Sequence, residues 1–373
     1  MPATPTEDLA EALRSRYPEL DEVRVAAGDQ PVYVVGGAVR DLLLGRERGE
    51  LDLVAIGDPG ALVAKLDPTA TEYERFGTAK TRVGGREVDI ARARSESYPQ
   101  PGALPEVEPA GEIESDLRRR DFSVNAMALP LAGESRLIDP HGGRDDLEAG
   151  RLRALHPGSF EDDPTRALRA ARYAARLGFE LEPGTEALLR RADLGTVSAD
   201  RRRAELLRLA AEPSAVAGLG LLAEWGLVEP APDGLALAAR ADELLAGDPW
   251  AESVDRAPAI LALALEPAGR ETALLGAPPA SPSAAVELAR GYRPPELLSA
   301  RVRGAEWLDR YLTEWSRVAL EIDGADLVAA GVPEGPAVGA GLAAALRRKL
   351  DGEIAGREQE LQAALTAARA ESR

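Results

Sequence analysis

The sequence contains no cysteine, which excludes disulfides, cysteine-ligated zinc, iron–sulfur clusters and cysteine nucleophiles. It has only two histidines, His141 and His156, so we expect neither a multi-histidine metal site nor a Ser–His–Asp hydrolase. Aromatic residues make up 4% of the chain, too few for broad base-stacking platforms. There is no signal-peptide pattern at the start and no apolar run near the roughly 18 residues of a membrane span. These absences predict a soluble, cytoplasmic protein that does not use a membrane.

The charge of the chain is unevenly distributed. The 373 residues carry a net charge of -18, which by itself argues against a nucleic-acid partner. Residues 151–212, however, hold 12 arginines against 10 acidic residues and form the only net-positive segment. The acidic excess lies before and after it, in residues 1–150 and 213–373. Any nucleic-acid contact is therefore expected to concentrate in the middle of the chain.

The pattern of apolar and turn-forming residues divides the chain into two kinds of structure. Its first part predicts a strand, a helix that ends at Gly45 and three further strands, with the strands at 31–35, 50–58, 79–83 and 86–92. Gly84-Gly85 predicts a hairpin turn, and the proline-rich residues 95–111 predict a long loop. From about residue 143 the pattern is helical, including a helix over 164–177 and one capped by Ser198. We therefore expect an α+β protein, with an N-terminal α/β head on a mixed sheet and an all-α remainder.

The first chemical motif is Gly36-Gly37 between the first strand and its helix. Backbone N–H groups at such a turn, together with the helix dipole, can hold phosphate, and Arg40 is one turn further on. The same residues are compatible with an ordinary turn when taken alone. The motif therefore predicts a phosphate site only in combination with others.

The second motif is a set of carboxylates on neighbouring strands. Glu50 and Asp52 share one face if residues 50–58 form a strand, and Asp89 lies on a strand nearby. Clustered carboxylates repel one another unless a cation lies between them, and oxygen ligands suit Mg²⁺. A solvated edge strand is the alternative for these three residues.

Two arginine-rich segments form the third motif. Residues 118–128 read RRRDFSVNAMA, and residues 162–172 read DDPTRALRAAR. Arg166, Arg169 and Arg172 recur every three residues and so fall on one side of a helix, with Asp163 just before Arg166. A charged solvent-facing surface is the alternative interpretation of such a stripe.

In order along the chain, these segments resemble the class II nucleotidyltransferases of tRNA 3′ ends and the bacterial poly(A) polymerases. The resemblance rests on GGAVRDLLLG, ELD, VDIARAR, RRRDFSVNAMA, LIDPHGGRDDL, EDDPTRALRAARYAARLGF and SADRRRAELL, and it is dense from about residue 31 to 210. It implies a nucleotidyltransferase head over residues 1–152, a helical neck over 153–212, a body over 213–300 and a tail over 301–373. It also implies Mg²⁺ as cofactor, CTP and ATP as substrates and tRNA as partner.

The resemblance assigns a role to each matching position. Asp52 and Glu50 would bind the catalytic metal, and Asp89 would be the third acidic residue. The nucleotide would be bound by Gly36, Gly37, Arg40, Arg120, Asp121, Asn125, Asp163, Arg166, Arg169 and Arg172. Among these, Asp163 and Arg166 would form a protein template, because an acceptor beside a donor matches the pairing edges of both cytosine and adenine. We further expect Arg201 and Arg202 of the arginine-rich neck to bind RNA.

The sequence departs from the family at Glu50, where other members have the first catalytic aspartate. The extra methylene moves the carboxylate by roughly one ångström, and a shift of about 1 Å can cost about a hundredfold in rate. An active enzyme with backbone compensation, a slowed enzyme and an inactive tRNA-binding relative are all compatible with this change. The other motifs look intact, so we expect activity.

Several activities exist within this family. Addition of the full CCA end is our expectation for this chain, against CC-only addition, A-only addition and poly(A) polymerase activity. Residues 95–111 lie where the family has a flexible loop, whose function CC-only members lack, and this argues mildly against CC-only addition. The acidic excess of residues 213–373 disfavours a poly(A) polymerase that grips arbitrary RNA. A-only addition shares every motif named here.

Overall fold

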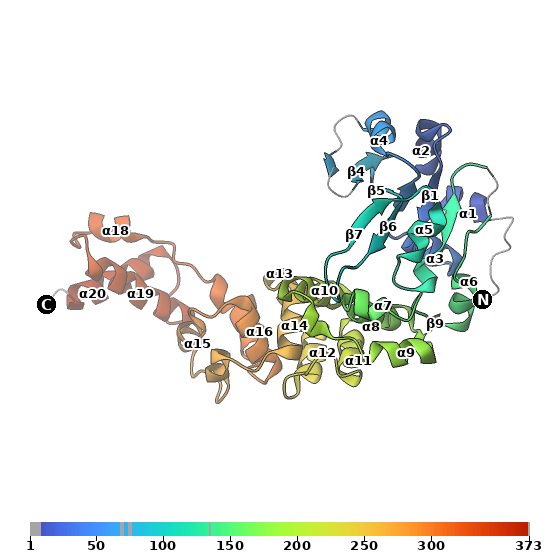
Figure 1. Ribbon diagram of the computed structural model, residues 1–373. Coiled ribbons are helices and arrows are strands. Elements are labelled where there is room, and N and C mark those ends of the chain that lie inside the picture. Colours follow the sequence, from blue (N-terminus) through green and yellow to red (C-terminus); the bar gives the residue numbers. More distant parts are fainter. Residues whose placement is uncertain (1–8, 68–70, 74–76, 134–135, 372–373) are drawn as a thin grey trace. The chain divides into compact units, whose positions relative to one another are not determined.

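The computed structural model describes residues 9–67, 71–73, 77–133 and 136–371 (Figure 1). The chain forms two compact units, Met1–Leu227 and Val228–Arg373. Within the described residues, no helix combines the length and the apolar composition needed to span a membrane. Each unit is described below on its own.

The first unit is built on a mixed six-stranded sheet with the strand order β3-β4-β5-β2-β1-β8. β2 and β5 run parallel, and the other neighbouring strands run antiparallel. The strands are β1 (Val32–Val35), β2 (Asp52–Ala55), β3 (Thr71–Tyr73), β4 (Thr78–Val83), β5 (Arg86–Arg92) and β8 (Ala128–Pro130). The mixed sheet confirms the predicted α+β head.

Both faces of the sheet are covered, because alternate residues of each strand point to opposite sides. Val34 and Leu53 belong to a large core, whereas Val35 and Val54 belong to a smaller core beneath α5 (Ile113–Arg118). Among the helices that contribute to the large core are α1 (Leu9–Arg16), α2 (Leu20–Ala27), α3 (Gly37–Leu43) and α4 (Gly60–Leu66). The sheet is therefore buried on both of its faces.

The turn between β4 and β5 is the predicted hairpin. Gly84 and Gly85 both have positive φ, at 57° and 82°, a combination that glycine adopts without strain. This turn fixes the register of β5 against β4. On its other side β5 pairs parallel with β2, and this pairing places Asp89 opposite Asp52, so two predicted catalytic positions are neighbours in the sheet.

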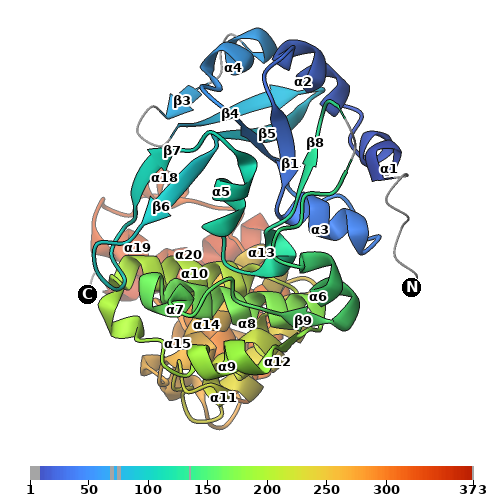
Figure 2. The same ribbon diagram turned by 45° about the vertical axis from the view of Figure 1, so that its right-hand side comes forward.

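The predicted loop over residues 95–111 is instead largely a second hairpin. β6 (Arg94–Ser97) and β7 (Glu106–Pro109) pair antiparallel as a two-stranded ribbon. The prolines do not prevent pairing because most lie in the connection, and Pro109 is the last residue of an edge strand. Figure 2 shows the ribbon running from the sheet toward α7 (Ser159–Asp162) and α10 (Ala199–Ala211).

The rest of the first unit is mostly helical. It contains α6 (Gly143–Ala149), α7, α8 (Thr165–Leu177), α9 (Pro183–Leu189), α10 and α11 (Ala215–Glu224), together with η3 (Ser123–Asn125), η4 (Leu194–Thr196) and the two-residue strands β9 (Arg151–Leu152) and β10 (Glu180–Leu181). α8 ends at Gly178, which adopts the left-handed conformation, and the Ser198 side chain caps α10 by accepting from Arg201 N. Both helices confirm the sequence prediction.

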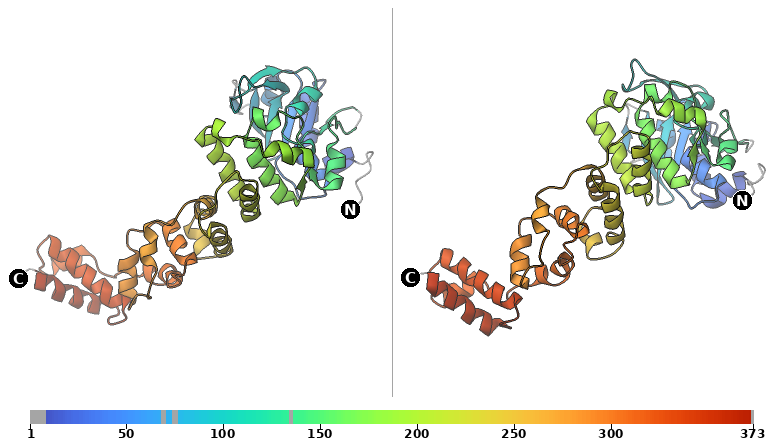
Figure 3. Two further views of the ribbon diagram at one scale, coloured as in Figure 1. Left: turned by 60° about the horizontal axis from the view of Figure 1, so that its bottom comes forward. Right: turned by 90° about the horizontal axis from the view of Figure 1, so that it is seen from below.

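The second unit is helical throughout its described part. Its elements are α12 (Gly234–Leu244), α13 (Trp250–Ser253), α14 (Arg256–Leu265), η5 (Arg270–Leu274), α15 (Pro282–Ala289), α16 (Pro294–Val302), α17 (Leu308–Thr313), η6 (Trp315–Arg317), α18 (Gly324–Ala329), α19 (Pro336–Leu350) and α20 (Arg357–Glu371). α19 and α20, red in Figure 3, lie side by side around a core that includes Leu327, Ala345 and Ala364. The predicted boundaries between neck, body and tail stay predictions.

Candidate active site

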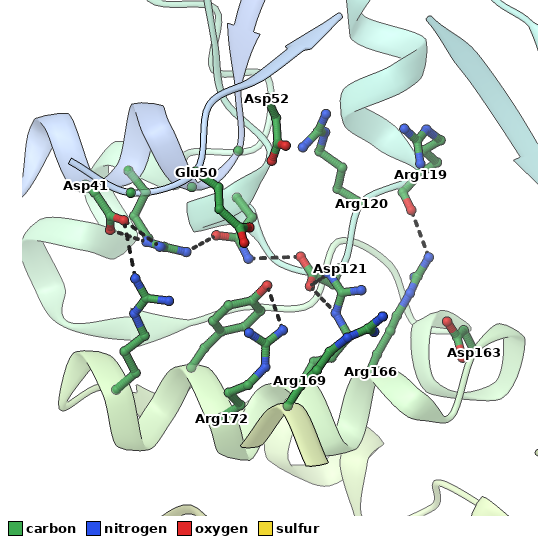
Figure 4. A pocket seen from close by; sticks show the side chains of 18 of the residues that line it. Asp41, Glu50, Asp52, Arg119, Arg120, Asp121, Asp163, Arg166, Arg169 and Arg172 are labelled. Atoms are coloured by element: carbon green, nitrogen blue, oxygen red, sulfur yellow. Dashed lines mark hydrogen bonds and ion pairs between the residues drawn. The ribbon is translucent and has the colours of Figure 1, made fainter. Parts of the chain in front are cut away.

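A cavity of about 920 Å³ lies in the first unit, and most of its lining side chains are charged. Twelve predicted nucleotide or metal residues line it: Gly36, Gly37, Arg40, Glu50, Asp52, Arg120, Asp121, Asn125, Asp163, Arg166, Arg169 and Arg172. They come from the β1–α3 turn, the start of β2, the segment after α5 and the helix α8 (Figure 4). Its many arginines make the cavity suited to a polyanion.

Gly36 forms the turn that opens this cavity between β1 and α3. Its φ of +67° favours glycine, and a Cβ atom there would lie 2.9 Å from Nη1 of Arg120. The glycine therefore permits a close approach of Arg120 to the β1–α3 turn. Whether phosphate binds at Gly36 and Gly37 stays a prediction.

Arg40 is almost fully buried and bonded within the protein. Its Nε and Nη2 donate to the carboxylate of Asp41 at 2.9 and 3.0 Å, and its Nη1 donates to Oδ1 of Asn125 at 2.7 Å. Asn125 in turn donates to Asp121, whose other oxygen is 2.6 Å from Nη2 of Arg169 on α8. A continuous line of charged hydrogen bonds thus joins the head to α8.

Asp121 is a strongly perturbed group in this line. Burial alone would raise its pKa, but Arg169, the Asn125 amide and Arg166 lower it to about 2. The carboxylate is therefore ionised at neutral pH, and it fixes the position of the Arg169 guanidinium. Asp121 and Arg169 were predicted as nucleotide contacts, and both line the cavity while bonding each other.

The carboxylates occupy the sheet edge of the cavity. β2 begins at Asp52, so Glu50 precedes the strand and the two residues do not share a strand face as predicted. Both nevertheless line the same cavity (Figure 4). Burial raises the pKa of Asp52, and the nearby charges of Glu50 and Asp89 raise it further, against the opposing effect of Arg120. Burial and the neighbouring carboxylates therefore outweigh the positive charges of Arg120 and Lys80 in setting the direction of the Asp52 pKa.

Asp89 lies opposite Asp52 across β2 and β5 but does not line the cavity. Its side chain is 40% exposed and lies 3.5 Å from Nζ of Lys80. Among the described residues, no group of three or more histidine, cysteine or acidic side chains could hold a metal ion. The two carboxylates of Glu50 and Asp52 do fit Mg²⁺, which binds through one or two carboxylates and completes its shell with substrate phosphates and water.

Arg166 and Asp163 lie at the far side of the cavity from Asp52 (Figure 4). Arg166 donates from Nη1 to Ser159 Oγ and from Nη2 to the Arg119 carbonyl, both at 2.8 Å. Asp163 accepts three hydrogen bonds through Oδ1, from Thr165 N, Thr165 Oγ1 and Arg201 Nη2. Both side chains are held by the protein and present their remaining groups to the cavity.

Arg201 and Arg202, predicted to bind RNA, do not line the cavity. Besides Asp163, Arg201 bonds the Gly102 carbonyl at 2.8 Å in the connection between β6 and β7. Arg202 donates to the Leu194 carbonyl at 3.3 Å. Both guanidinium groups therefore make hydrogen bonds within the protein.

Sequence reasoning missed several residues that shape the cavity: Asp41, Arg94, Glu96, Tyr98, Asp116, Arg119, Tyr173, Arg176, Arg208 and Glu212. Arg176 was detectable, because it extends the face of Arg169 and Arg172 by one further helical turn. Asp116 is fully buried and orients Arg119 and Arg120 at 2.8 and 2.9 Å. Glu96 and Tyr98 gave no signal, because they lie in the segment interpreted as a loop.

A mixed sheet with carboxylates beside an arginine-rich cavity, followed by a helical neck, is the arrangement of a nucleotidyltransferase. Residues 32–153 match the family described as "Poly A polymerase head domain". The "CC-adding tRNA nucleotidyltransferase" of Deinococcus radiodurans is 36% identical over 91% of this chain and 90% of that protein. The chain therefore belongs to the tRNA nucleotidyltransferase family, as the resemblance implied, and is an enzyme that transfers nucleotides.

Two further relatives differ in name. The "A-adding tRNA nucleotidyltransferase" of Aquifex aeolicus is 46% identical over 43% of this chain but only 20% of that protein. The structure of the "Thermotoga maritima CCA-adding enzyme complexed with tRNA_CCA" aligns with a TM-score of 0.74 and 28% identity, over 96% of this chain and 98% of that one. These similar proteins therefore belong to one family, but their names describe the addition of different nucleotides.

Proposed function

We propose that this enzyme adds CMP, CMP and AMP to tRNA 3′ ends, using CTP and ATP and releasing pyrophosphate. The observation that supports this proposal is the cavity itself, which holds Glu50 and Asp52 on one side and Asp163 and Arg166 on the other. One site thus contains carboxylates for the chemistry and a donor–acceptor pair for a nucleobase. No nucleic-acid template is needed for such a selection.

Base selection follows from the hydrogen-bonding groups of the template pair. Asp163 only accepts and Arg166 only donates, and within the described residues the hydrogen bonds to Asp163 all use Oδ1 and leave Oδ2 without one. Cytosine and adenine each present an amino donor beside a ring-nitrogen acceptor, which matches this pair. Guanine and uracil present a carbonyl and a ring N–H, leaving buried groups unpaired at a cost of about 1–3 kcal/mol each.

The transfer forms a bond between the RNA 3′ oxygen and the α-phosphorus and breaks the bond to pyrophosphate. We propose Mg²⁺ as the cofactor, held by Glu50 and Asp52, where it would supply positive charge to the reacting oxygens. Asp52 would also accept the proton of the RNA 3′ hydroxyl as general base. Gly36, Gly37 and Arg40 would hold the triphosphate, beside Arg120.

CC-only addition is the second candidate, because the relative that matches nearly the whole chain bears that name. A stretch that covers 43% of the chain is also similar to an A-adding enzyme. We propose that tRNA is the acceptor in each case and that its acceptor end meets the arginine-rich residues 151–212. Since tRNA is a cytoplasmic molecule, we place the reaction in the cytoplasm.

Nucleotide incorporation by the purified chain with Mg²⁺ tests the proposal. The acceptors are tRNA lacking its 3′ end, tRNA ending in C, tRNA ending in CC and an unrelated RNA, each with the four nucleoside triphosphates singly and together. Addition of CCA that then stops supports the proposal. Addition that stops after CC, addition of A to CC ends only, or long A tails on any RNA each identifies a different family activity. No incorporation by the unsubstituted chain makes it a tRNA-binding relative.

A further inference from the structure

Tyr98 directly follows β6 and contributes an aromatic ring to the cavity. Among the described lining residues only Tyr173 is also aromatic, and its ring is already occupied. The guanidinium carbons of Arg40 and Arg172 lie 5.6 and 4.7 Å from its centroid, and Phe122 meets it edge-on. Tyr98, by contrast, is partly exposed, and one ring contact is recorded for it, to Arg166.

The protein holds the Tyr98 ring in place from its polar end. Its hydroxyl donates to Glu96 at 3.2 Å, and the other oxygen of Glu96 accepts from Arg94 and Arg119 at 3.1 and 2.9 Å. Burial raises the pKa of Tyr98 to about 12, so the hydroxyl stays a neutral donor. A ring already fixed in this way loses little conformational entropy when a planar ligand covers it.

The position of Arg166 indicates which ligand that is. Its guanidinium carbon lies over the Tyr98 ring, 5.9 Å from the centroid. A base that pairs with a guanidinium lies in nearly the same plane, because both groups are flat and their hydrogen bonds lie in that plane. Such a base would extend the layer that Arg166 forms over the ring.

We propose that Tyr98 stacks on the face of the incoming nucleobase whose pairing edge is selected by Asp163 and Arg166. This inference rests on the proposed function, because it takes those two residues as the template. Stacking tolerates every base, since each has a π face. Tyr98 therefore supplies affinity for nucleotides in general, while the template pair supplies the choice among them.

Equilibrium nucleotide binding tests whether Tyr98 supplies affinity while Asp163 and Arg166 supply base selectivity. The parent is the full chain carrying Asp52→Asn, which holds nucleotide without turnover, and Tyr98→Leu and Tyr98→Phe are introduced into it. The probes are CTP, ATP, GTP, UTP and inorganic triphosphate, measured by calorimetry. Tyr292→Leu is the matched control, because Tyr292 also lies under an arginine, Arg270 at 4.6 Å, but belongs to the second unit.

We expect Tyr98→Leu to weaken all four nucleotides about tenfold, which equals about 1.4 kcal/mol and lies within the range of base–aromatic stacking. ATP and GTP should lose most because the purines are the larger bases, Tyr98→Phe should restore part of the affinity because it keeps the ring without the Glu96 hydrogen bond, and inorganic triphosphate should bind unchanged. Equal loss for inorganic triphosphate would overturn the proposal, since the variant would then have disturbed the whole cavity. Loss confined to CTP and ATP would also overturn it, because Tyr98 would then act by positioning Arg166.

The two proposals fail in different ways. Failure of the proposed function appears in the unsubstituted chain, as absent incorporation or as equal affinity for all four nucleotides. Failure of the stacking proposal appears only in the comparison between Tyr98 and its leucine variant. Unchanged affinity for CTP and ATP in Tyr98→Leu contradicts stacking, whatever the unsubstituted chain incorporates.

Discussion

Nη2 of Arg201 lies 3.0 Å from Oδ1 of Asp163, and Nη1 of the same guanidinium holds the Gly102 carbonyl at 2.8 Å. Gly102 lies in the β6–β7 connection, where its φ is +70° and a Cβ atom would lie 2.5 Å from Thr196 Oγ1. Its N–H also donates to the carbonyls of Glu161 and Asp162. One arginine thus joins the proposed template carboxylate to the β6–β7 ribbon and to α10.

Replacement of Arg201 tests whether it positions the template or binds RNA. Arg201→Gln should lower the preference for CTP and ATP over GTP and UTP about tenfold, because a hydrogen bond to a charged group is worth about 1.5–3 kcal/mol and Asp163 would then be held by Thr165 without the arginine. The affinity for tRNA should change little. Single-nucleotide incorporation and filter binding measure the two effects.

Arg202→Gln is the matched control for this prediction, since Arg202 is the next residue on α10 and donates to the Leu194 carbonyl rather than to Asp163. Base preference should be unchanged in that variant. If Arg201→Gln instead weakens tRNA binding and keeps its base preference, the sequence-based prediction of an RNA contact is correct.

Local signals explain which parts of the fold were predictable. Strands β1, β4 and β5, the Gly84-Gly85 turn and the start of α10 each depend on neighbouring residues, and all were found from the sequence. The β6–β7 ribbon was missed because its prolines resemble those of a loop. Pairing between residues such as Arg94 and Pro109 is determined by tertiary contacts rather than by local propensity.

The candidate site shows the same division between local and distant information. Motif spacing identified the lining residues Asp52, Asp121 and Arg166. It gave no indication that Arg201 would bond Gly102, because these residues are separated by 99 positions. Nor could it show that Arg40 is committed to Asp41, since the same sequence could direct the arginine into the cavity. Hydrogen-bond partners that are distant in the sequence can be identified only when the fold is known.

We expect the Asp52 carboxylate to be needed for activity but to lower the stability of the folded state at neutral pH. Its pKa is raised, so the folded state holds the proton more tightly than the unfolded state. The stabilising contribution is therefore full below the ordinary aspartate pKa and is lost as pH rises through the raised value. Asp52→Asn should abolish incorporation yet raise the melting temperature at pH 7 without added metal, and this gain should disappear in acid.

Asp89→Asn serves as the control for stability, because Asp89 is 40% exposed and already paired with Lys80. We expect its melting temperature at pH 7 to be no higher than that of the unsubstituted chain. Thermal unfolding followed by circular dichroism at several pH values measures both variants. A lower melting temperature for Asp52→Asn at pH 7 would contradict this prediction, because the Asp52 carboxylate would then stabilise the folded state.

We expect the backbone at position 50 to place a glutamate carboxylate better for catalysis than an aspartate carboxylate. Nη2 of Arg86 donates to the carbonyl of Gly49, so the chain entering Glu50 is tied to β5. Glu50→Asp should withdraw the carboxylate by about one ångström and lower kcat by up to about a hundredfold. Glu87→Asp, the same change at an exposed position of β5, should leave kcat unchanged.

A second variant separates geometry from chemistry at this position. Arg86→Gln releases the Gly49 carbonyl, and in the Glu50→Asp background it should recover part of the lost rate. Single-turnover incorporation of CMP measures each variant. A Glu50→Asp enzyme faster than the unsubstituted chain would instead identify Glu50 as the cause of a slowed enzyme.

The stability of the second unit should depend on a buried ion pair between α19 and α20. Nζ of Lys349 lies 2.6 Å from Oε1 of Glu360, whose side chain is fully buried and whose Oε2 accepts from the backbone N–H of Glu321. Burial alone would raise the pKa of Glu360, but the Lys349 hydrogen bond and that backbone N–H lower it overall. Lys349→Met removes the cation and should destabilise the chain by about 3 kcal/mol, because a buried charge then lacks its partner.

Urea unfolding of the full chain, followed by tryptophan fluorescence, measures this loss, since three of the four tryptophans, Trp250, Trp307 and Trp315, lie in the second unit. Adding Glu360→Gln to Lys349→Met should recover much of the stability, because the amide is neutral and its oxygen still accepts from Glu321 N. Arg348→Met is the matched control, as its pair with Glu353 is exposed and worth less than about 1 kcal/mol. Equal unfolding midpoints for Lys349→Met and Arg348→Met would contradict a stabilising role for the buried pair. If only Lys349→Met loses stability, and Glu360→Gln restores it, the cause of the loss is the uncompensated charge of Glu360 between α19 and α20.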